Sequence, residues 1–419
     1  MTIAHDSSSL AELAASRRAF HQAPELLGAP AAFRSALRIL ARNWGVGTLT
    51  FVLPSGRELR LEGAERGPEA RLMVRDFRFM NRVLAAGDIG FAEGYMAGEW
   101  ETPDLAALLC VFSLNFDRLA RIVLGNPVMG AFNRLVHLFR PNTRAGARRN
   151  IHAHYDLGNA FYSRWLDPTM TYSAALYETP GQPLAEAQRN KYRSLARQME
   201  LDRDHSVLEI GCGWGGFAEF AAREVGAKVT AITISQEQYD FAARRIFDQG
   251  LADRAQIRMV DYRDVEGRFD RVASIEMFEA VGEKYWPAYF GKIAEVLTPG
   301  GRASLQIITI QDELFDDYRR RADFIQRYIF PGGMLISEAR LKAETGAAGL
   351  AWSGIKRFGQ HYADTLAEWT RRFEAAWDDI RSLGFDERFR RLWSFYLAYC
   401  EAGFRTERTN VVQLGLTRP

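Results

Sequence analysis

The chain is 419 residues long, which is enough for two domains of ordinary size. Apolar residues make up 47% and charged residues 25%, the balance of a soluble globular protein, and no run of about 18 apolar residues is present that could cross a membrane. The three cysteines are Cys110, Cys212 and Cys400. Their odd number and wide spacing argue against a disulfide framework, and no metal site is expected. Because no secretory signal is recognisable, we expect a cytoplasmic protein.

A basic stretch lies at residues 118–155, although the net charge of the whole chain is only +2. This stretch has no acidic residue, and large apolar residues lie between its seven arginines, which are Arg118, Arg121, Arg134, Arg140, Arg144, Arg148 and Arg149. Such a pattern is typical of an amphipathic segment on an anionic membrane, and equally of a solvated helix face followed by a linker. Nucleic acid is not an expected partner, because no helix-turn-helix or aromatic stacking signature accompanies the charge.

The first half of the chain predicts a small α+β domain. Residues 10–42 have helical periodicity, and the runs 47–53 and 58–61 flank a Pro-Ser-Gly turn, which is typical of a hairpin. A third strand is expected at 70–74, with helices following to residue 112. We find no constellation of catalytic groups here. The sequence therefore predicts an N-terminal domain at residues 1–145 that contacts lipid or membrane, and a catalytic domain at residues 146–419.

In the second half, strands and helices alternate, which predicts a mostly parallel, doubly wound α/β sheet with helices on both faces. The expected strands are 207–210, 228–234, 257–260, 269–275 and 302–310. In open sheets of this kind, ligands bind beyond the carboxyl ends of the strands, so we look for chemistry at those ends.

A turn with four glycines, at positions 211, 213, 215 and 216, joins the first of these strands to a helix. Its spacing fits the dinucleotide fingerprint, but that fingerprint also wants an acidic residue about 20 positions later. The next strand has no carboxylate at its tip, and the acid is Glu209, two residues before the first glycine. This arrangement resembles motif I of class I S-adenosylmethionine (SAM) methyltransferases. SAM is therefore the expected ligand of a Rossmann-like fold, with a nicotinamide enzyme as the alternative.

Several further motifs resemble the cyclopropane-fatty-acyl-phospholipid synthase family across about residues 150–415. They are His154-Tyr-Asp, Met170-Thr-Tyr-Ser173, Glu209-Ile-Gly-Cys-Gly-Trp-Gly215, Asp261-Tyr-Arg-Asp264, Ser274-Ile-Glu-Met-Phe-Glu279, Tyr328-Ile-Phe-Pro-Gly-Gly333, Phe358-Gly with Tyr362 and Thr365, and Tyr399-Cys with Gly403-Phe404. The resemblance implies transfer of the SAM methyl group to the double bond of an unsaturated phospholipid acyl chain, followed by proton loss that closes a cyclopropane. It also implies a bound bicarbonate as the base.

The resemblance carries catalytic roles onto Glu279, Tyr362, Gln306, Ile308 and Cys400. Glu279 would orient the bicarbonate, and Tyr362 would donate a hydrogen bond near the cation. We regard Cys400 as a pocket or structural residue, because the mechanism needs no covalent intermediate. Each residue also has a structural interpretation: Glu279 could cap a helix, Tyr362 could be a core tyrosine, and Gln306 could satisfy a backbone group.

Three positions depart from the family pattern: Ala174 replaces a cysteine, Ala280 a histidine, and Gln306 the histidine that contacts bicarbonate. The backbone N–H of residue 174 can still make its contact, but a glutamine cannot carry charge near neutral pH. Methyl transfer is therefore the firmer expectation. If ring closure fails, the expected product is a methyl-branched or methylene lipid.

The resemblance also implies a set of residues around SAM. Tyr172 and Ser173 would face the methionine end, and the glycine turn would pass beneath it. A ribose contact from the Gln238 amide would replace the missing carboxylate, and Asp261 would accept from the adenine amino group. The full set is Tyr172, Ser173, Glu209, Gly211, Gly213, Thr233, Ile234, Gln238, Asp261 and Tyr262.

Other functions remain open: a SAM methyltransferase of the same fold that acts on a soluble small molecule, and a catalytically silent lipid-binding protein. The basic stretch at 118–155 favours a lipid substrate over the first, and the presence of both Glu279 and Tyr362 argues against the second. The expected partners are an unsaturated phospholipid and the anionic inner face of the membrane, to which the protein would be peripheral. A homodimer is compatible with this interpretation.

Overall fold

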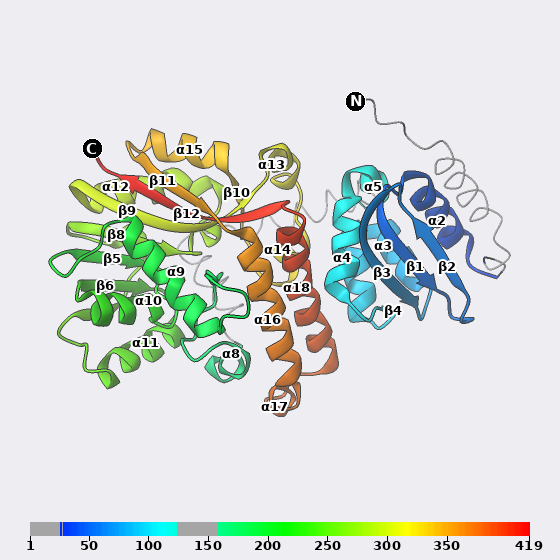
Figure 1. Cartoon of the computed structure of the whole chain (residues 1–419), viewed down its shortest axis with the longest axis horizontal. Helices are drawn as coiled ribbons and strands as arrows, with labels where there is room; N and C mark the ends of the chain where they lie inside the picture. Colours follow the sequence, from blue (N-terminus) through cyan, green and yellow to red (C-terminus); the bar gives the residue numbers. More distant parts are fainter. Residues whose placement is uncertain (1–25, 27, 124–156) are drawn as a thin grey trace. The chain divides into compact units, whose positions relative to one another are not determined.

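The computed structural model describes residue 26, residues 28–123 and residues 157–419, and its contacts divide the chain into two units (Figure 1). The first unit comprises Met1–Leu135 and Phe385–Thr406, and the second comprises Val136–Gly384 and Glu407–Pro419. The boundary predicted at 145/146 lies outside the described residues. The segment 385–406, which the sequence analysis assigned to the catalytic domain, groups with the first unit by its contacts.

The first unit is a four-stranded sheet with helices, ordered β2-β1-β3-β4. Its strands are β1 (Val46–Val52), β2 (Glu58–Glu62), β3 (Glu65–Val74) and β4 (Trp100–Glu101), and its helices are α2 (Ala31–Asn43), α3 (Arg78–Met96), α4 (Leu105–Leu114), α5 (Phe116–Val123) and α18 (Glu387–Arg405). The expected hairpin is confirmed, because β1 and β2 pair antiparallel. Strand β2 alternates exposed and buried residues, so only one face of it is buried.

The side chain of Asn115 joins the end of α4 to the start of β1. It is fully buried, its Oδ1 accepts from the backbone N–H groups of Gly45 and Val46 at 2.8 and 3.1 Å, and its Nδ2 donates to the carbonyls of Val46 and Val111 at 2.9 and 2.8 Å. A single amide therefore satisfies four backbone groups. Removing it would leave buried polar groups without partners.

The second unit is built on an eight-stranded sheet whose main path runs β11-β12-β9-β8-β5-β6-β7, with β10 paired to β9. The strands are β5 (Ser206–Ile210), β6 (Lys228–Thr233), β7 (Ala255–Met259), β8 (Phe269–Ile275), β9 (Leu297–Ile310), β10 (Ile336–Ser337), β11 (Ala351–Arg357) and β12 (Thr409–Thr417). Strands β5 to β9 pair parallel, which confirms the predicted fold class. Strand β12 was not predicted. It pairs antiparallel with both β9 and β11.

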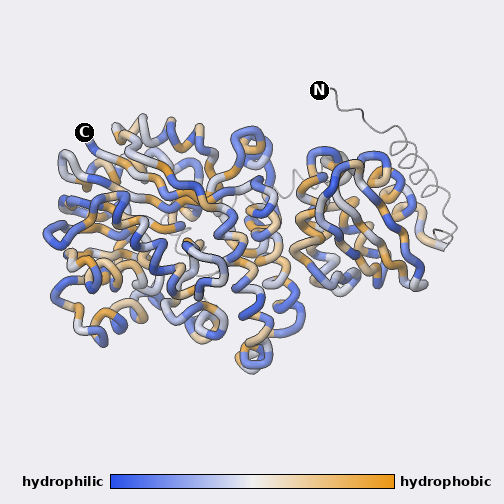
Figure 2. Tube along the Cα trace, in the orientation of Figure 1, coloured by the Kyte–Doolittle hydropathy of each residue, from blue (hydrophilic) through white to orange (hydrophobic). Residues whose placement is uncertain are grey.

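Helices cover both faces of this sheet, and hydrophobic and hydrophilic residues alternate along them (Figure 2). The α-helices are α8 (Asn159–Trp165), α9 (Leu184–Gln198), α10 (Gly216–Phe220), α11 (Gln236–Asp248), α12 (Trp286–Val296), α13 (Asp312–Tyr318), α14 (Phe324–Tyr328), α15 (Glu338–Ala347), α16 (Gly359–Ala375) and α17 (Trp377–Ser382). The shorter turns are η2 (Ala221–Val225), η3 (Tyr262–Asp264), η4 (Phe278–Ala280) and η5 (Glu283–Tyr285).

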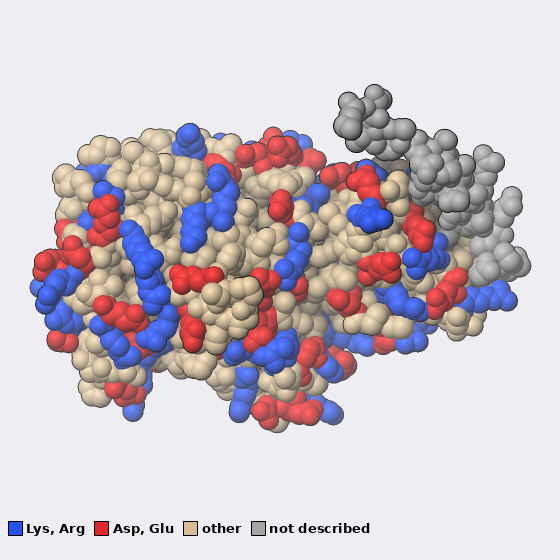
Figure 3. Space-filling model, viewed as in Figure 1, with Lys and Arg blue, Asp and Glu red and all other residues tan. Residues whose placement is uncertain are grey.

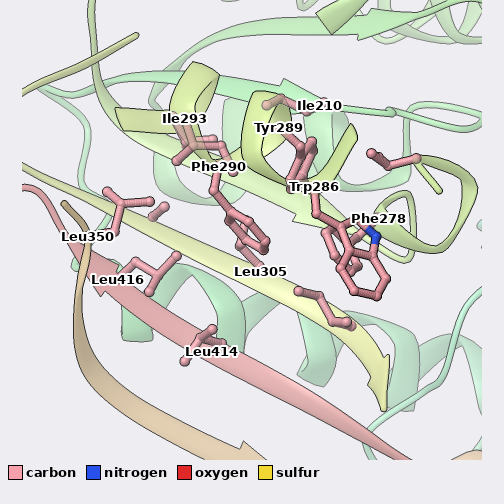
Figure 4. Close-up of a cluster of buried hydrophobic side chains, with 14 of the residues drawn as sticks. Ile210, Phe278, Trp286, Tyr289, Phe290, Ile293, Leu305, Leu350, Leu414 and Leu416 are labelled. Atoms are coloured by element: carbon pink, nitrogen blue, oxygen red, sulfur yellow. The ribbon is translucent and has the colours of Figure 1, made fainter. Parts of the chain in front are cut away.

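Two hydrophobic clusters, one on each face, hold these layers together. Neighbouring residues of β5 point to opposite faces: Val207 packs with side chains of α9 and α10, whereas Leu208 packs with side chains of α12 and β9. Figure 4 shows the cluster that contains Leu208. It includes Trp286, Phe290 and Ile293 of α12, Leu305 of β9 and Leu414 of β12. A sheet buried on both faces holds the carboxyl ends of its strands in fixed positions, and the candidate site lies there.

We expect Asn115→Ala to destabilise the first unit. The free energy of opening of the β1 amides, measured by native-state hydrogen exchange, should fall by about 2 kcal/mol, because buried N–H and C=O groups lose their partners. Asn43→Ala is the control, since this exposed asparagine donates only to the carbonyl of Ile39 within its own helix. Equal protection of β1 in the two variants would contradict the assignment.

Candidate active site

The glycine turn at the end of β5 leaves space for a ligand. Gly211 and Gly213 have φ of +81° and +51°, and the backbone N–H groups of Gly211 and Cys212 donate to the carbonyl of Ile232 on the next strand. A Cβ added at Gly213 would meet no atom within 4 Å, whereas one added at Gly216 would lie 2.4 Å from the hydroxyl of Tyr192. The turn is therefore open at Gly213, whereas Gly216, the first residue of α10, packs closely against Tyr192 of α9.

Glu209 lies on β5 immediately before this turn and is buried. Burial raises the pKa of its carboxyl to about 8, although the charges of Lys191 and Arg245 and the backbone N–H of Ala218 act in the opposite direction. Its Oε2 atom has no hydrogen-bond partner among the described residues. A buried acceptor without a partner, next to an open turn, fits a group that a cosubstrate would satisfy.

At the end of β6, Thr233 donates to the amide oxygen of Gln238 at 2.9 Å, and Ser235 caps α11 by accepting from the backbone N–H of Gln238. Thr233 and Gln238 are both buried, and Ile234 lies between Thr233 and the cap. With its oxygen engaged, Gln238 can offer its amide nitrogen as a donor. This suits the ribose contact expected of it, which stays a prediction.

At the end of β7, the carboxylate of Asp261 is held by its neighbour Arg263. Oδ1 accepts from the Arg263 backbone N–H and Nε at 3.1 and 2.8 Å, and Oδ2 accepts from Nη2 at 2.6 Å. Burial raises the pKa of Tyr262 to about 12, and its ring meets that of Tyr289 edge-on at 5.4 Å. Both side chains are fixed at the sheet edge, and their expected contacts with adenine stay predictions.

Sequence reasoning missed Glu276, which follows β8 directly and is held by groups from three distant parts of the chain. Its Oε1 accepts from the Ala174 backbone N–H at 2.8 Å and from Gln306 Nε2 at 2.7 Å, and its Oε2 accepts from the Tyr362 hydroxyl at 2.6 Å. The backbone of Glu276 has φ of +50°, which is uncommon for a residue other than glycine. Its position at a strand end was the available signal, but these three partners are distant in the sequence.

The amide of Gln306 is fully engaged within the protein. Nε2 donates to Glu276 and to the carbonyl of Ala174 at 3.3 Å, and Oε1 accepts from Gln413 on β12 at 3.1 Å. Gln306 is also almost completely buried. Its immediate effect is therefore to orient Glu276.

Burial is the largest influence on the pKa of Glu276 and raises it. The hydrogen bond from Tyr362, the charge of Lys191 and the donors on Gln306 and Ala174 all lower it, because each stabilises the ionised form. The carboxylate thus has several partners that favour its charge in a water-poor position. Such a group is poised to accept a proton.

Glu279 and Ile308 form a second contact beside Glu276. Oε1 of Glu279 accepts from the backbone N–H of Ile308 at 2.6 Å, and Oε2 is buried without a partner among the described residues. Burial, and then the charge of Glu276, raise the pKa of Glu279 to about 8. Glu279 is therefore mostly protonated at neutral pH and can donate a hydrogen bond.

Aromatic rings surround Tyr172 and Tyr362. The ring centroid of Trp369 on α16 lies 5.2 Å from that of Tyr172 and 6.1 Å from that of Tyr362, and Trp165 and Tyr162 lie within 5.7 Å of Tyr172. The next residue, Ser173, is buried and its hydroxyl accepts from Lys191 at 2.6 Å. The negative faces of such rings favour a cation nearby.

The structure brings together Gln306, Tyr362 and the unpredicted Glu276, and pairs Glu279 with Ile308. Cys400 is half-buried on α18, which belongs to the first unit, and its role stays a prediction. Among the described residues, no group of three or more His, Cys, Asp or Glu side chains could hold a metal ion, and no helix is long and apolar enough to span a membrane.

Comparison with known proteins gives a consistent result. The family model described as mycolic acid cyclopropane synthetase matches residues 142–414. The tuberculostearic acid methyltransferase UfaA1 of Mycobacterium tuberculosis is 40% identical, over 80% of this chain and 80% of the relative. The cyclopropane-fatty-acyl-phospholipid synthase of Escherichia coli K12 is 35% identical, over 83% of this chain and 88% of the relative. A crystal structure of the mycolic acid cyclopropane synthase CmaA1 with SAH and CTAB aligns with a TM-score of 0.61 at 28% identity, over 64% of this chain and 98% of that chain.

We expect Glu279→Gln to change how stability depends on pH. The folded protein keeps the Glu279 proton up to about pH 8, whereas the unfolded chain releases it near the ordinary value of 4.5. Wild-type stability contributed by this group is therefore present at low pH and lost as pH rises between these values. The glutamine cannot ionise, so the melting temperature of the variant relative to wild type should rise by roughly 3 °C or more between pH 5 and pH 8.

Glu313→Gln serves as the control, because Glu313 is exposed in the first turn of α13. Its melting temperature relative to wild type should stay constant over the same range. A constant difference for Glu279→Gln as well would contradict the raised pKa.

Proposed function

Because this chain belongs to the mycolic acid cyclopropane synthetase family of SAM-dependent methyltransferases, we propose that it transfers the SAM methyl group to the double bond of an unsaturated acyl chain in a phospholipid. The name of the E. coli relative supports a phospholipid substrate. The sulfur–methyl bond breaks, its electron pair stays on sulfur, and the alkene pair forms the new carbon–carbon bond. A carbocation remains on the other alkene carbon.

An alkene is a weak nucleophile, so the site must align it with the methyl group and exclude water. Gly211 and Gly213 would pass beneath SAM, with Glu209 before them. The rings of Tyr172, Trp369 and Tyr362 would stabilise the positive charge as it moves from sulfur to carbon.

The observation that carries the mechanism is the carboxylate of Glu276, held by Ala174, Gln306 and Tyr362. We assign it as the base that accepts the proton lost by the cation. While ionised it also stabilises the cation electrostatically, so both steps depend on its charge. The bicarbonate that the family resemblance implies would need the same three donors, and all of them already bind Glu276. A bound bicarbonate is thus not required.

This arrangement favours an unsaturated methyl-branched or methylene product. Ring closure takes a proton from the transferred methyl group while the cation lies on the other former alkene carbon. The electron pair of the broken C–H bond then joins the methyl carbon to the cationic carbon and closes the ring. If the base takes a proton from a carbon bonded directly to the cationic centre, that pair forms a new double bond instead and gives a methyl-branched alkene. A methylene product needs a hydride shift first, which moves the cation to the methyl-bearing carbon, before a methyl proton is lost. The departures from the family pattern at Ala174, Ala280 and Gln306 support the second course. The cyclopropane remains the second candidate, supported by the name of the E. coli relative.

A peripheral position on an anionic membrane is part of the proposal, because the substrate is a membrane lipid. It rests on the basic stretch at 118–155, most of which lies outside the described residues. On the face shown in Figure 3, positive and negative side chains are interspersed, and Arg118 itself pairs with Glu65 at 2.9 Å. The described residues add no basic surface on that face. A homodimer stays a prediction from the sequence.

Glu276→Gln should lower turnover with SAM and a monounsaturated phospholipid at least about a hundredfold, because the amide cannot accept the proton. SAM affinity, measured by calorimetry, should change by less than about threefold, since the amide keeps the size and an acceptor oxygen. Glu344→Gln, which changes a buried carboxylate paired with Arg340 on α15, is the matched control and should retain activity. Full activity of Glu276→Gln would refute the assignment.

Product analysis tests the proposed reaction itself. In buffer depleted of bicarbonate, wild-type enzyme with SAM and a monounsaturated phospholipid should give a product one CH₂ heavier that still takes up hydrogen under mild hydrogenation. Added bicarbonate should not change its rate of formation. A product that resists hydrogenation, formed only with bicarbonate, would establish the cyclopropane and contradict the role of Glu276. Absence of any methylated lipid would contradict the proposed function.

A further inference from the structure

Lys191 is a fully buried lysine on α9 that none of the roles above uses. Its ammonium group donates to the hydroxyl of Ser173 at 2.6 Å and lies 4.7 Å from the ring centroid of Tyr192. A buried ammonium is costly unless opposite charges compensate it. Its retention in the core calls for such charges nearby.

Three carboxyl groups from three different parts of the chain act electrostatically on Lys191. In order of their influence they are Glu276 after β8, Asp167 after α8 and Glu209 on β5. Burial lowers the pKa of Lys191 to about 7, although each of these groups acts in the opposite direction, so the ammonium is charged at acidic pH. Asp167 and Glu209 each have one buried oxygen without a hydrogen-bond partner among the described residues. The ammonium is therefore a cation that stabilises the ionised forms of this cluster, together with Arg245, whose charge also acts on Glu209.

Lys191 is also tied to the partners of Glu276 through hydrogen bonds. Ser173, which accepts from its ammonium, precedes Ala174, whose backbone N–H donates to Glu276. On the other side, Gln413 donates both to the carbonyl of Lys191 and to Gln306 Oε1. Lys191 is thus linked, through Ser173 and Gln413, to two of the partners that hold the Glu276 carboxylate.

We propose that Lys191 is a positioning residue for the methyl transfer: its charge keeps Glu276 ionised, and its bond to Ser173 fixes the Ala174 N–H group. The inference rests on the proposed function, because it explains what keeps ionised the carboxylate that we assign as the base. Glu276 also faces Glu279, whose negative form would oppose its ionisation, and Tyr362, whose hydroxyl supports it. Of the groups facing Glu276, Lys191 is the cation.

The test compares pH–rate profiles of wild type and Lys191→Met with SAM and a monounsaturated phospholipid. Without the ammonium, Glu276 takes up a proton more readily as pH falls. The rate of the variant at the acidic end should therefore fall about tenfold further below its own plateau than the wild-type rate does, because an opposite charge that favours ionised Glu276 is lost. Lys191→Arg, which keeps the charge, should bring the acidic end back toward wild type.

Gln188→Leu is the matched control. Gln188 lies on the same helix, is fully buried and donates to the carbonyl of the same Ser173 at 2.9 Å, but it carries no charge. Its variant should lower the plateau without altering the shape of the profile. An unchanged profile in Lys191→Met, or an equal change in Gln188→Leu, would overturn the proposal and leave the methyl transfer itself intact.

A stability measurement keeps the proposal testable without activity. Lys191→Met leaves Glu276 without its compensating cation, so its urea midpoint should fall well below wild type. The double variant Lys191→Met/Glu276→Gln removes both charges and should recover much of that loss. If Lys191→Met does not fold, folding of the double variant supports the proposal. A double variant no more stable than Lys191→Met alone would overturn it.

Discussion

The site depends on one constraint: a carboxylate is held in a water-poor position by donors from three parts of the chain. Glu276 stands at the tip of β8, and its oxygens meet the Ala174 backbone, the Gln306 amide and the Tyr362 hydroxyl. The parallel sheet makes this possible, because it brings the ends of β8 and β9 to one edge and is buried on both faces. Left-handed backbone geometry at Glu276 is tolerated because these contacts fix it.

Beside this carboxylate lies a second buried carboxyl group, Glu279, whose hydrogen-bond partners and neighbouring charges differ from those of Glu276. Glu279 has a single backbone donor and faces the charge of Glu276, so its pKa rises to about 8. Burial also raises the pKa of Glu276, but its three donors and Lys191 act against that rise. One carboxyl is thereby suited to donate a hydrogen bond and the other to accept a proton. Such a division between paired carboxyl groups is common in enzymes that perform acid–base chemistry at neutral pH.

The features that sequence could predict were local ones. The glycine turn and the alternation of strands and helices gave the fold class and SAM, and the fold, the family and the cosubstrate are confirmed. Glu276 was missed because its role depends on partners that lie 30, 86 and 102 positions away. Strand β12 and helix α18 were also not anticipated, since the place of each is set by packing against distant segments. Gln306 was noticed, but its use in orienting Glu276 became evident only from the geometry.

The central claim is that Glu276 replaces an external base. A crystal structure of the complex with SAH and an unsaturated phospholipid, grown in bicarbonate-containing buffer, tests it most directly. The account predicts the Glu276 carboxylate beside the acyl double bond, still bound to Ala174, Gln306 and Tyr362, with no anion between them. A bicarbonate bound to those three donors, with Glu276 turned away from the acyl chain, would contradict it.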